Sequence, residues 1–426
     1  MQRMLRRGHR FVPWALCLSI LLSINDPGMA KTEILSGYLR LRPVLRSARD
    51  DTPNNPGAVL FDTTSRYVQA FGLLHANFDY RETRLFFQAR PQCELRNGRS
   101  DCDIHLDEGY LDMEAAPSLF VSGGRRNIVN GVAHIANPTD FLGEEEEIDR
   151  TLDETERREL RKGTYLAGLE YFFDDGTSLS AIAAPRVKGL QDRKDRLQLK
   201  LALLYPEIDT DLEVIGLATA DRPGIGVNLS HTFNDSTVLY TESALRRGRD
   251  RSVIVADAAG NRIVEGDRNK GYFDSVVGGR YTFDSGVNLI LEYRYNGNGY
   301  GSGEWGTIQE FFETNTRGLS TPETIAKAIG NLGQGNREII GVDSLRQRYL
   351  FSRLNYPQSW GDIDSSLILL NNLDDGSHLL RGRIEKDVTD RIRTGAMVEY
   401  RTGDSGDEFG LRPWNRAVTF DLKLFF

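Results

Sequence analysis

Basic residues recur at every second position in several stretches of the chain. Arg40 and Arg42 form one such pair, and Arg381 and Arg383 form another. Because successive side chains of a β-strand point to opposite faces, a spacing of two places both guanidinium groups on one face. Rows of fixed cations in a pore favour anions. The spacing therefore indicates anion recognition by a β-structure.

Closing such strands into a barrel, with the polar phase inward, would make the first and last strands neighbours and merge their cations into one basic wall. The predicted pore-lining basic residues are Arg40, Arg42, Arg84, Arg90, Arg381, Arg383, Arg391, Arg393, Arg401 and Lys423. The fourth strand instead presents an acidic patch of Glu108, Asp112 and Glu114. Inward acids at Glu292, Glu385 and Glu399 interrupt the basic row, so pairing of charges across neighbouring strands is the alternative to anion conduction.

Motifs for enzymatic chemistry are absent from the sequence. The histidines lack metal-ligand spacing, and there is neither a Gly-x-Ser-x-Gly elbow nor a phosphate loop. We therefore predict no catalytic residue, no metal and no cofactor. A Ser–His pair assembled from separate strands around His134 or His231 is the enzymatic alternative.

Two cysteines, Cys93 and Cys102, follow the first thirty residues and lie close together in sequence. In an exported chain this spacing favours a disulfide that closes a small loop.

Apolar and polar residues alternate along the segments that must position these groups. At the C-terminus Val418, Phe420, Leu422 and Leu424 alternate with largely polar neighbours, and the same pattern recurs at 197–203 and 287–296. Alternation alone fits a soluble sandwich as well as a membrane barrel.

Connection lengths separate these two folds. Tight links at 80–82, 174–176, 234–236, 284–286 and 388–390 alternate with mostly longer ones at 47–64, 127–162, 248–269, 298–345 and 402–415. This sorting predicts an all-β, transmembrane antiparallel β-barrel of about eighteen strands, with sixteen as the other count and both termini periplasmic.

Residues 1–30 have the features of a cleaved signal peptide: four arginines, an apolar run from Trp14 to Ile24 and a small-residue site ending at Ala30. Residues 31–426 then form a single barrel in the outer membrane of a Gram-negative cell. The net charge is −8, and removing the leader takes away more basic than acidic residues. Nucleic acid is therefore excluded as a partner.

The two longest links, 127–162 and 298–345, are candidates for a constriction, a gate or a solvated surface loop. The first predicts a short charged helix over 149–161. The second predicts a helix over 321–331 whose Ile325, Ala328 and Ile329 would pack against the barrel mouth.

A Gly-Arg pair, Gly124-Arg125, ends a predicted strand, and Asn137-Pro138-Thr139-Asp140 follows it. This element resembles one in Gram-negative outer-membrane channels, and the last strand resembles the signal read by the barrel-assembly machinery. With its strand number and basic lumen, the chain looks like the alginate-export family. That resemblance implies an eighteen-stranded barrel with a basic pore for an anionic polysaccharide.

We expect an outer-membrane channel, surrounded by lipid, for passive passage of anionic solutes, with export of an acidic exopolysaccharide as the resemblance implies. The alternatives are a general small-solute porin, a hydrolase and an adhesin-type barrel.

Overall fold

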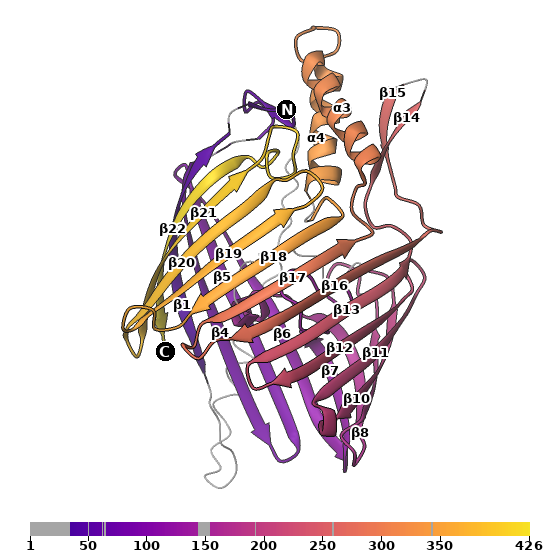
Figure 1. Ribbon diagram of the computed structural model, residues 1–426, viewed down its shortest axis with the longest axis vertical. Helices are drawn as coiled ribbons and strands as arrows, with labels where there is room; N and C mark the ends of the chain where they lie inside the picture. Colours follow the sequence, from indigo (N-terminus) through magenta and orange to yellow (C-terminus); the bar gives the residue numbers. More distant parts are fainter. Residues whose placement is uncertain are drawn as a thin grey trace.

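The chain forms a closed antiparallel β-barrel of 18 strands (Figure 1). The computed structural model describes residues 35–49, 51–61, 63, 65–143, 154–191, 193–257, 260–341 and 344–426. The ring closes because β1 pairs with β4 on one side and with β22 on the other. The predicted fold class is confirmed, with eighteen strands rather than sixteen. The signal peptide predicted at 1–30 lies outside the described residues.

The strands of the barrel follow the chain around the ring, each pairing with the next. They are β1 (Ser36–Ala48), β4 (Arg66–Tyr80), β5 (Thr83–Arg96), β6 (Arg99–Ala116), β7 (Leu119–Arg126), β8 (Thr164–Phe172), β9 (Ser178–Ala184), β10 (Arg196–Tyr205), β11 (Thr210–Thr219), β12 (Gly224–Asn234), β13 (Thr237–Arg247), β16 (Gly271–Thr282), β17 (Asn288–Asn296), β18 (Arg348–Tyr356), β19 (Ile363–Asn372), β20 (His378–Thr389), β21 (Ile392–Thr402) and β22 (Trp414–Phe425).

Side chains alternate across the barrel wall in the sense opposite to that of a soluble protein. In β10, Leu199 points outward and is 53% exposed, whereas its neighbour Gln198 points inward and is 1% exposed. Exposed leucines likewise alternate with buried Arg40 in β1 and with buried Asp421 and Lys423 in β22. Apolar groups therefore cover the outside of the barrel, and polar groups line much of its inside.

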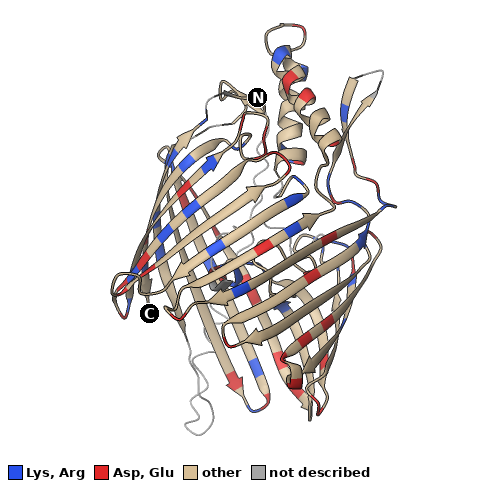
Figure 2. Cartoon of the chain, in the orientation of Figure 1, with Lys and Arg blue, Asp and Glu red and all other residues tan. Residues whose placement is uncertain are grey.

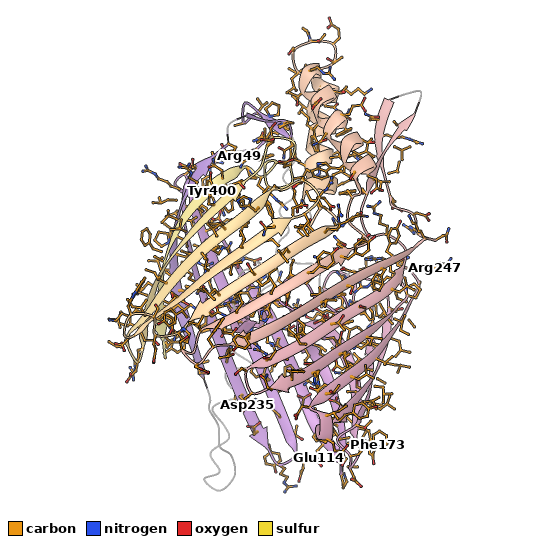
Figure 3. The ribbon with its side chains drawn as sticks, in the orientation of Figure 1. Arg49, Glu114, Phe173, Asp235, Arg247 and Tyr400 are labelled. Atoms are coloured by element: carbon orange, nitrogen blue, oxygen red, sulfur yellow. A yellow bond between two sulfur atoms is a disulfide. The ribbon has the colours of Figure 1, made fainter. Side chains whose placement is uncertain are left out.

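The two ends of the barrel differ in the length of their connections. We call them the loop end, where the links at 127–163, 248–270, 297–347 and 403–413 lie, and the turn end, where short turns join the strands. Figure 3 shows Arg49, Tyr400 and Arg247 towards the loop end and Glu114, Asp235 and Phe173 towards the turn end. Ser36 of β1 and Phe425 of β22 both lie at the turn end.

One connection at the loop end is much shorter than its neighbours. Asn97 and Gly98 join β5 to β6 with φ values of 51° and 73°. Two successive residues with positive φ are typical of a type I′ hairpin turn, which Asn-Gly favours. Nearby, Cys93 and Cys102 lie directly opposite each other in the strand pair and form a disulfide.

Helices and small hairpins project beyond the loop end (Figure 1). They are α3 (Ser302–Gly318), α4 (Ile325–Gly335), the π-helical turn η2 (Asn336–Ile340), the β14 (Val253–Asp257) and β15 (Gly260–Val264) hairpin, and the short pair β2 (Asp51–Thr52) and β3 (Asn55–Pro56). Two further short elements are η1 (Pro206–Ile208), between β10 and β11, and α2 (Glu154–Glu159).

The helix predicted at 321–331 exists as α4, and of its predicted apolar stripe Ala328 is buried. The other two stripe residues were assigned wrongly. Ile325 and Ile329 are 41% and 39% exposed, and Leu332 is instead buried with Phe311 and Phe312 of α3. The sequence did not predict α3, because glycines at 301, 303 and 306 disfavour a helix there. With a partner helix present, α4 packs against α3 rather than against the barrel mouth.

Within the described ranges, no helix combines the length and the apolar composition needed to cross a membrane as a helix.

Candidate functional site

The link between β7 and β8 folds into the barrel and contacts its inner wall. Two glutamates of the wall bind the main chain of this link. The carboxylate of Glu242 in β13 accepts hydrogen bonds from the amides of Val132 and Ala133. The carboxylate of Glu292 in β17 accepts those of His134 and Ile135 at 2.7 and 2.6 Å. We call residues 127–143 the lumen segment.

A glycine makes one of these contacts sterically feasible. Gly131 has a φ of +87°, and a Cβ atom built there would lie 2.2 to 2.4 Å from the carboxylate atoms of Glu242. A side chain would therefore clash with the carboxylate and strain the main chain. The close approach of Glu242 requires glycine at position 131.

Apolar contacts complete the attachment of the lumen segment. Ala133, Ile135 and Ala136 pack on Tyr240 and Phe351 in one buried cluster. Phe141 is buried in a second cluster, with Ile215, Leu217 and Ala244. The link left open in the sequence as a constriction, a lid or a surface loop thus lies inside the barrel over its described part.

The helix α2 carries the link to the opposite wall, where most of the predicted basic residues lie. Glu156 of α2 is 3% exposed and binds Arg40 of β1, Arg383 of β20 and Lys423 of β22, with closest N···O distances of 2.9, 2.9 and 2.6 Å. Burial alone would raise the pKa of Glu156, but these three cations hold it well below its usual value. The carboxylate is therefore ionised.

Carboxylates of the wall also neutralise the basic row. Arg40 and Arg42 both bind Asp421, and Arg383 also binds Glu385 at 2.7 Å. Arg381 and Arg401 share Glu399. Figure 2 shows basic residues recurring along the strands at the left of the view, interrupted by acidic ones. The inward acids noted in the sequence thus pair with the cations beside them.

The remaining predicted basic residues lie away from this row or at its edge. Arg90 binds Asp107 at 2.8 Å, and Arg393 binds Asp387 at 2.6 Å near the turn end. Arg84 is half exposed beside Asp79, and Arg391 is exposed at the turn between β20 and β21. These four residues therefore lie outside the enclosed cluster of cations around Glu156.

The predicted acidic residues do not form a single patch facing open space. Glu108 accepts a hydrogen bond from the amide of Asn127 at 2.8 Å, and Asp112 binds Arg126 at 2.7 Å. Glu114 is exposed at the turn end (Figure 3). Asp107, which strict alternation would turn outward, is fully buried inside because the β5–β6 register shifts between Gln88 and Ala89.

A chamber of about 610 Å³ lies between the lumen segment and the connections of the loop end. Ile135 of the lumen segment lines one side, and Ser344, Phe409 and Pro413 of two long connections line another. The charged side chains of the lining are Arg42, Arg46, Arg381, Arg401, Arg412, Glu399 and Glu408. Five arginines against two glutamates give this space an excess of positive charge.

Three charged residues of the chamber, Arg46, Glu408 and Arg412, were not predicted from the sequence. The guanidinium carbon of Arg46 lies 4.7 Å from the ring centroids of both Tyr67 and Trp414, and Arg401 lies 3.7 Å from Trp414. The buried Nε of Arg46 has no hydrogen-bond partner among the described residues. The even spacing of Arg46 from Arg40 and Arg42 was the signal that could have extended the predicted basic row to it.

Glu408 joins the connection at 403–413, which lines the chamber, to the barrel wall. Its carboxylate accepts hydrogen bonds from the Tyr349 hydroxyl at 2.6 Å, the Asn372 amide group at 2.8 Å and the Leu345 amide at 2.9 Å. Burial raises the pKa of Glu408. One buried carboxylate therefore joins the connection at 403–413 to the end of the connection at 297–347.

The two histidines of the enzymatic alternative lie at separate places, His231 in β12 and His134 in the lumen segment. The His231 ring contacts the hydroxyl of Thr210 at 2.9 Å. Burial and the nearby Arg157 lower the pKa of His134 to about 3, so its ring is neutral. In the described part of the chain, no group of three or more His, Cys, Asp or Glu residues could hold a metal ion.

The barrel is similar to solved structures from Pseudomonas aeruginosa. OpdQ matches with a TM-score of 0.50 at 10% identity, covering 94% of this chain and 99% of that one. OccK11 (OpdR) matches with a TM-score of 0.49 at 11% identity, covering 92% and 96%. The outer membrane protein opdK matches with a TM-score of 0.49 at 10% identity, covering 92% and 99%. At these identities the likeness is one of fold. No family model and no curated protein matches the chain.

Proposed function

We propose that the chain is a porin-type channel of a Gram-negative outer membrane that passes small solutes and prefers anions. The arginine-rich chamber inside the barrel is the observation that carries this proposal. Its volume lies within the range of 300 to 1,000 Å³, roughly that of sites for small organic ligands. Its excess of arginine lowers the barrier for anions relative to cations.

The outer surface supports a membrane location. Large apolar side chains on the outward phase are exposed all around the ring, including Leu39, Leu199, Leu291 and Leu422, which are 45–53% exposed. Apolar surface of this extent indicates a site that is covered by lipid or protein. Outward aromatics at the turn end, such as Tyr171, Phe173 and Phe283, fit the interface position of a girdle.

Small solutes fit this lumen better than the polysaccharide that the alginate-export resemblance implied. The lumen segment and α2 lie inside the barrel and contact opposite walls, and each cation around Glu156 already has a carboxylate partner. The solved structures reported above do not support the alginate-export family. The general porin, expected from the sequence as the alternative, therefore becomes the main proposal.

The zero-current potential in a planar bilayer under a KCl gradient tests this proposal. We expect anion selectivity in the wild-type chain and a several-fold smaller anion-to-cation permeability ratio in the triple variant Arg42→Gln, Arg46→Gln and Arg401→Gln. The matched control is Arg268→Gln, because that arginine is exposed in the β15–β16 link outside the barrel.

Wild-type cation selectivity, or a triple variant as selective as the wild type, would contradict the role of the chamber. A barrel without conductance that binds a surface partner would favour the adhesin alternative.

A further inference from the structure

The contacts of Glu156 are those of a bound carboxylate. Arg383 donates NH1 to one carboxylate oxygen at 2.9 Å and NH2 to the other at 3.0 Å. Arg40 and Lys423 add donors at 2.9 and 2.6 Å. A guanidinium that contacts both oxygens of one carboxylate is a specific recognition geometry. Strands β1, β20 and β22 thus build a preformed carboxylate site, and a side chain of the same protein occupies it.

The wall retains an excess of positive charge without this occupant. Among the ion pairs of the described residues, the wall carboxylates that bind Arg40, Arg42 and Arg383 are Asp421 and Glu385, and Lys423 adds a fourth cation beside them. Removing Glu156 would leave buried cations without full compensation, which is unfavourable in a partly dehydrated interior. If a second carboxylate takes the place of the Glu156 side chain in the site, this cost does not arise, because the charge at the site does not change.

The helix that carries Glu156 is attached differently from the lumen segment. The lumen segment is held by Glu242, Glu292 and two buried apolar clusters. The described contacts of α2 are polar: Tyr38 donates to the Glu159 carboxylate at 2.9 Å, Gln88 to the Glu159 carbonyl at 2.8 Å, and Arg157 to the His134 carbonyl at 2.9 Å. Water can replace hydrogen bonds of this kind, so α2 can leave the wall while the lumen segment stays bound.

We infer that Arg40, Arg383 and Lys423 form a binding site for the carboxylate of a permeating solute, and that Glu156 occupies this site in the resting channel. A solute carboxylate exchanges with Glu156, and α2 then moves away from the wall. This inference rests on the proposed channel function and adds its regulation. Chloride lacks two oxygens to span the guanidinium of Arg383, so it exchanges far less well than a carboxylate.

The mobility of α2 tests the exchange directly. Arg158 is exposed on α2, and a nitroxide on Arg158→Cys, in a chain with Cys17→Ser, reports this mobility by electron paramagnetic resonance. Cys93 and Cys102 are joined to each other and do not react. We expect sodium gluconate to convert the immobile spectrum into a mobile one, and sodium chloride of the same ionic strength to have much less effect.

Variants of Glu156 supply the second test. Glu156→Gln, added to the labelled chain, should give a mobile spectrum without gluconate. Glu310→Gln, at an exposed position on the external helix α3, should behave as the wild type. Equal effects of chloride and gluconate would show simple screening of charge and would overturn the inference. An immobile label in Glu156→Gln would also overturn it.

Failure of the inference and failure of the proposed function are distinguishable. The label is measured in detergent micelles without any current, whereas anion selectivity is measured in a bilayer. The gluconate response of the wild-type label also needs no substitution at Glu156. A channel that is not anion-selective but releases α2 with gluconate would disprove the proposed function and leave the carboxylate site intact.

Discussion

Individual polar side chains inside the barrel perform different tasks although they share the same inward phase. Glu242 and Glu292 hold main-chain amides of the lumen segment, Glu399 neutralises two arginines, and Arg46 stacks on aromatic rings. A spacing of two predicts that such residues face inward. It cannot predict their partners, because the partner of Glu242 lies 109 residues away in a connection.

Gly131 is the residue on which the contact between the lumen segment and Glu242 depends. We expect Gly131→Ala to destabilise the attachment of the lumen segment by about 1–3 kcal/mol, because a Cβ atom meets the Glu242 carboxylate at a positive φ. Hydrogen exchange of the amides of residues 132–135 measures this loss.

Gly306→Ala is the matched control, since a Cβ atom there meets nothing within 4 Å and α3 is helical. That change should stabilise α3 by up to about 1 kcal/mol and leave the exchange of residues 132–135 unchanged. Unaltered exchange in Gly131→Ala would show that Glu242 does not hold the segment.

Elements were predicted from the sequence with unequal success, for physical reasons. Barrel strands were found because each alternates under one local rule, and the long link after β7 was placed correctly. The β5–β6 turn at Asn97-Gly98 and the helix α3 were missed. The inward fold of residues 127–143 depends on buried contacts with five or more strands, which no local pattern contains.

The stability with which Glu408 holds the connection at 403–413 should depend on pH. Burial raises the pKa of Glu408 above its ordinary value of 4.5, so the attached connection binds a proton more tightly than the detached one. The attachment is therefore strongest below about pH 4.5 and weakens as the pH rises through the raised pKa.

Hydrogen exchange at the Leu345 amide, corrected for the intrinsic effect of pH, measures this dependence. Protection should fall as pH rises in the wild type and stay flat in Glu408→Gln, which retains an oxygen acceptor. The groups facing Glu408 are Tyr349, Asn372, Arg412 and Asp375. A slope that survives in Glu408→Gln would assign the titration to one of these neighbours.

For the molecule as a whole, the distribution of apolar surface decides where the protein resides. Leu199 in the middle of β10 is 53% exposed, while the inward Gln198 beside it is buried. The composition of the chain resembles that of a soluble protein and does not reveal this outward placement of apolar residues. The alternation of short and long connections was the feature that predicted it. The side of the membrane that each end faces stays a prediction.

Leu199→Arg tests the membrane location through stability. In lipid vesicles this variant should lose about 2–4 kcal/mol of unfolding free energy, the cost of a cation near the bilayer midplane. Leu190→Arg, at a position 60% exposed in the β9–β10 link, should lose about 1 kcal/mol or less. Equal stabilities of both variants in urea titrations would mean that β10 does not face lipid.

The ring closes between the two barrel strands that are furthest apart in sequence, β1 and β22. Such a contact has the largest contact order in the molecule, so it forms late in folding, and an unclosed intermediate exposes two unpaired strand edges. Glu156 contacts Arg40 on one side of this seam and Lys423 on the other. The binding site of α2 therefore does not exist until the ring is complete. In the order of assembly, the wall forms first and Glu156 binds to it afterwards.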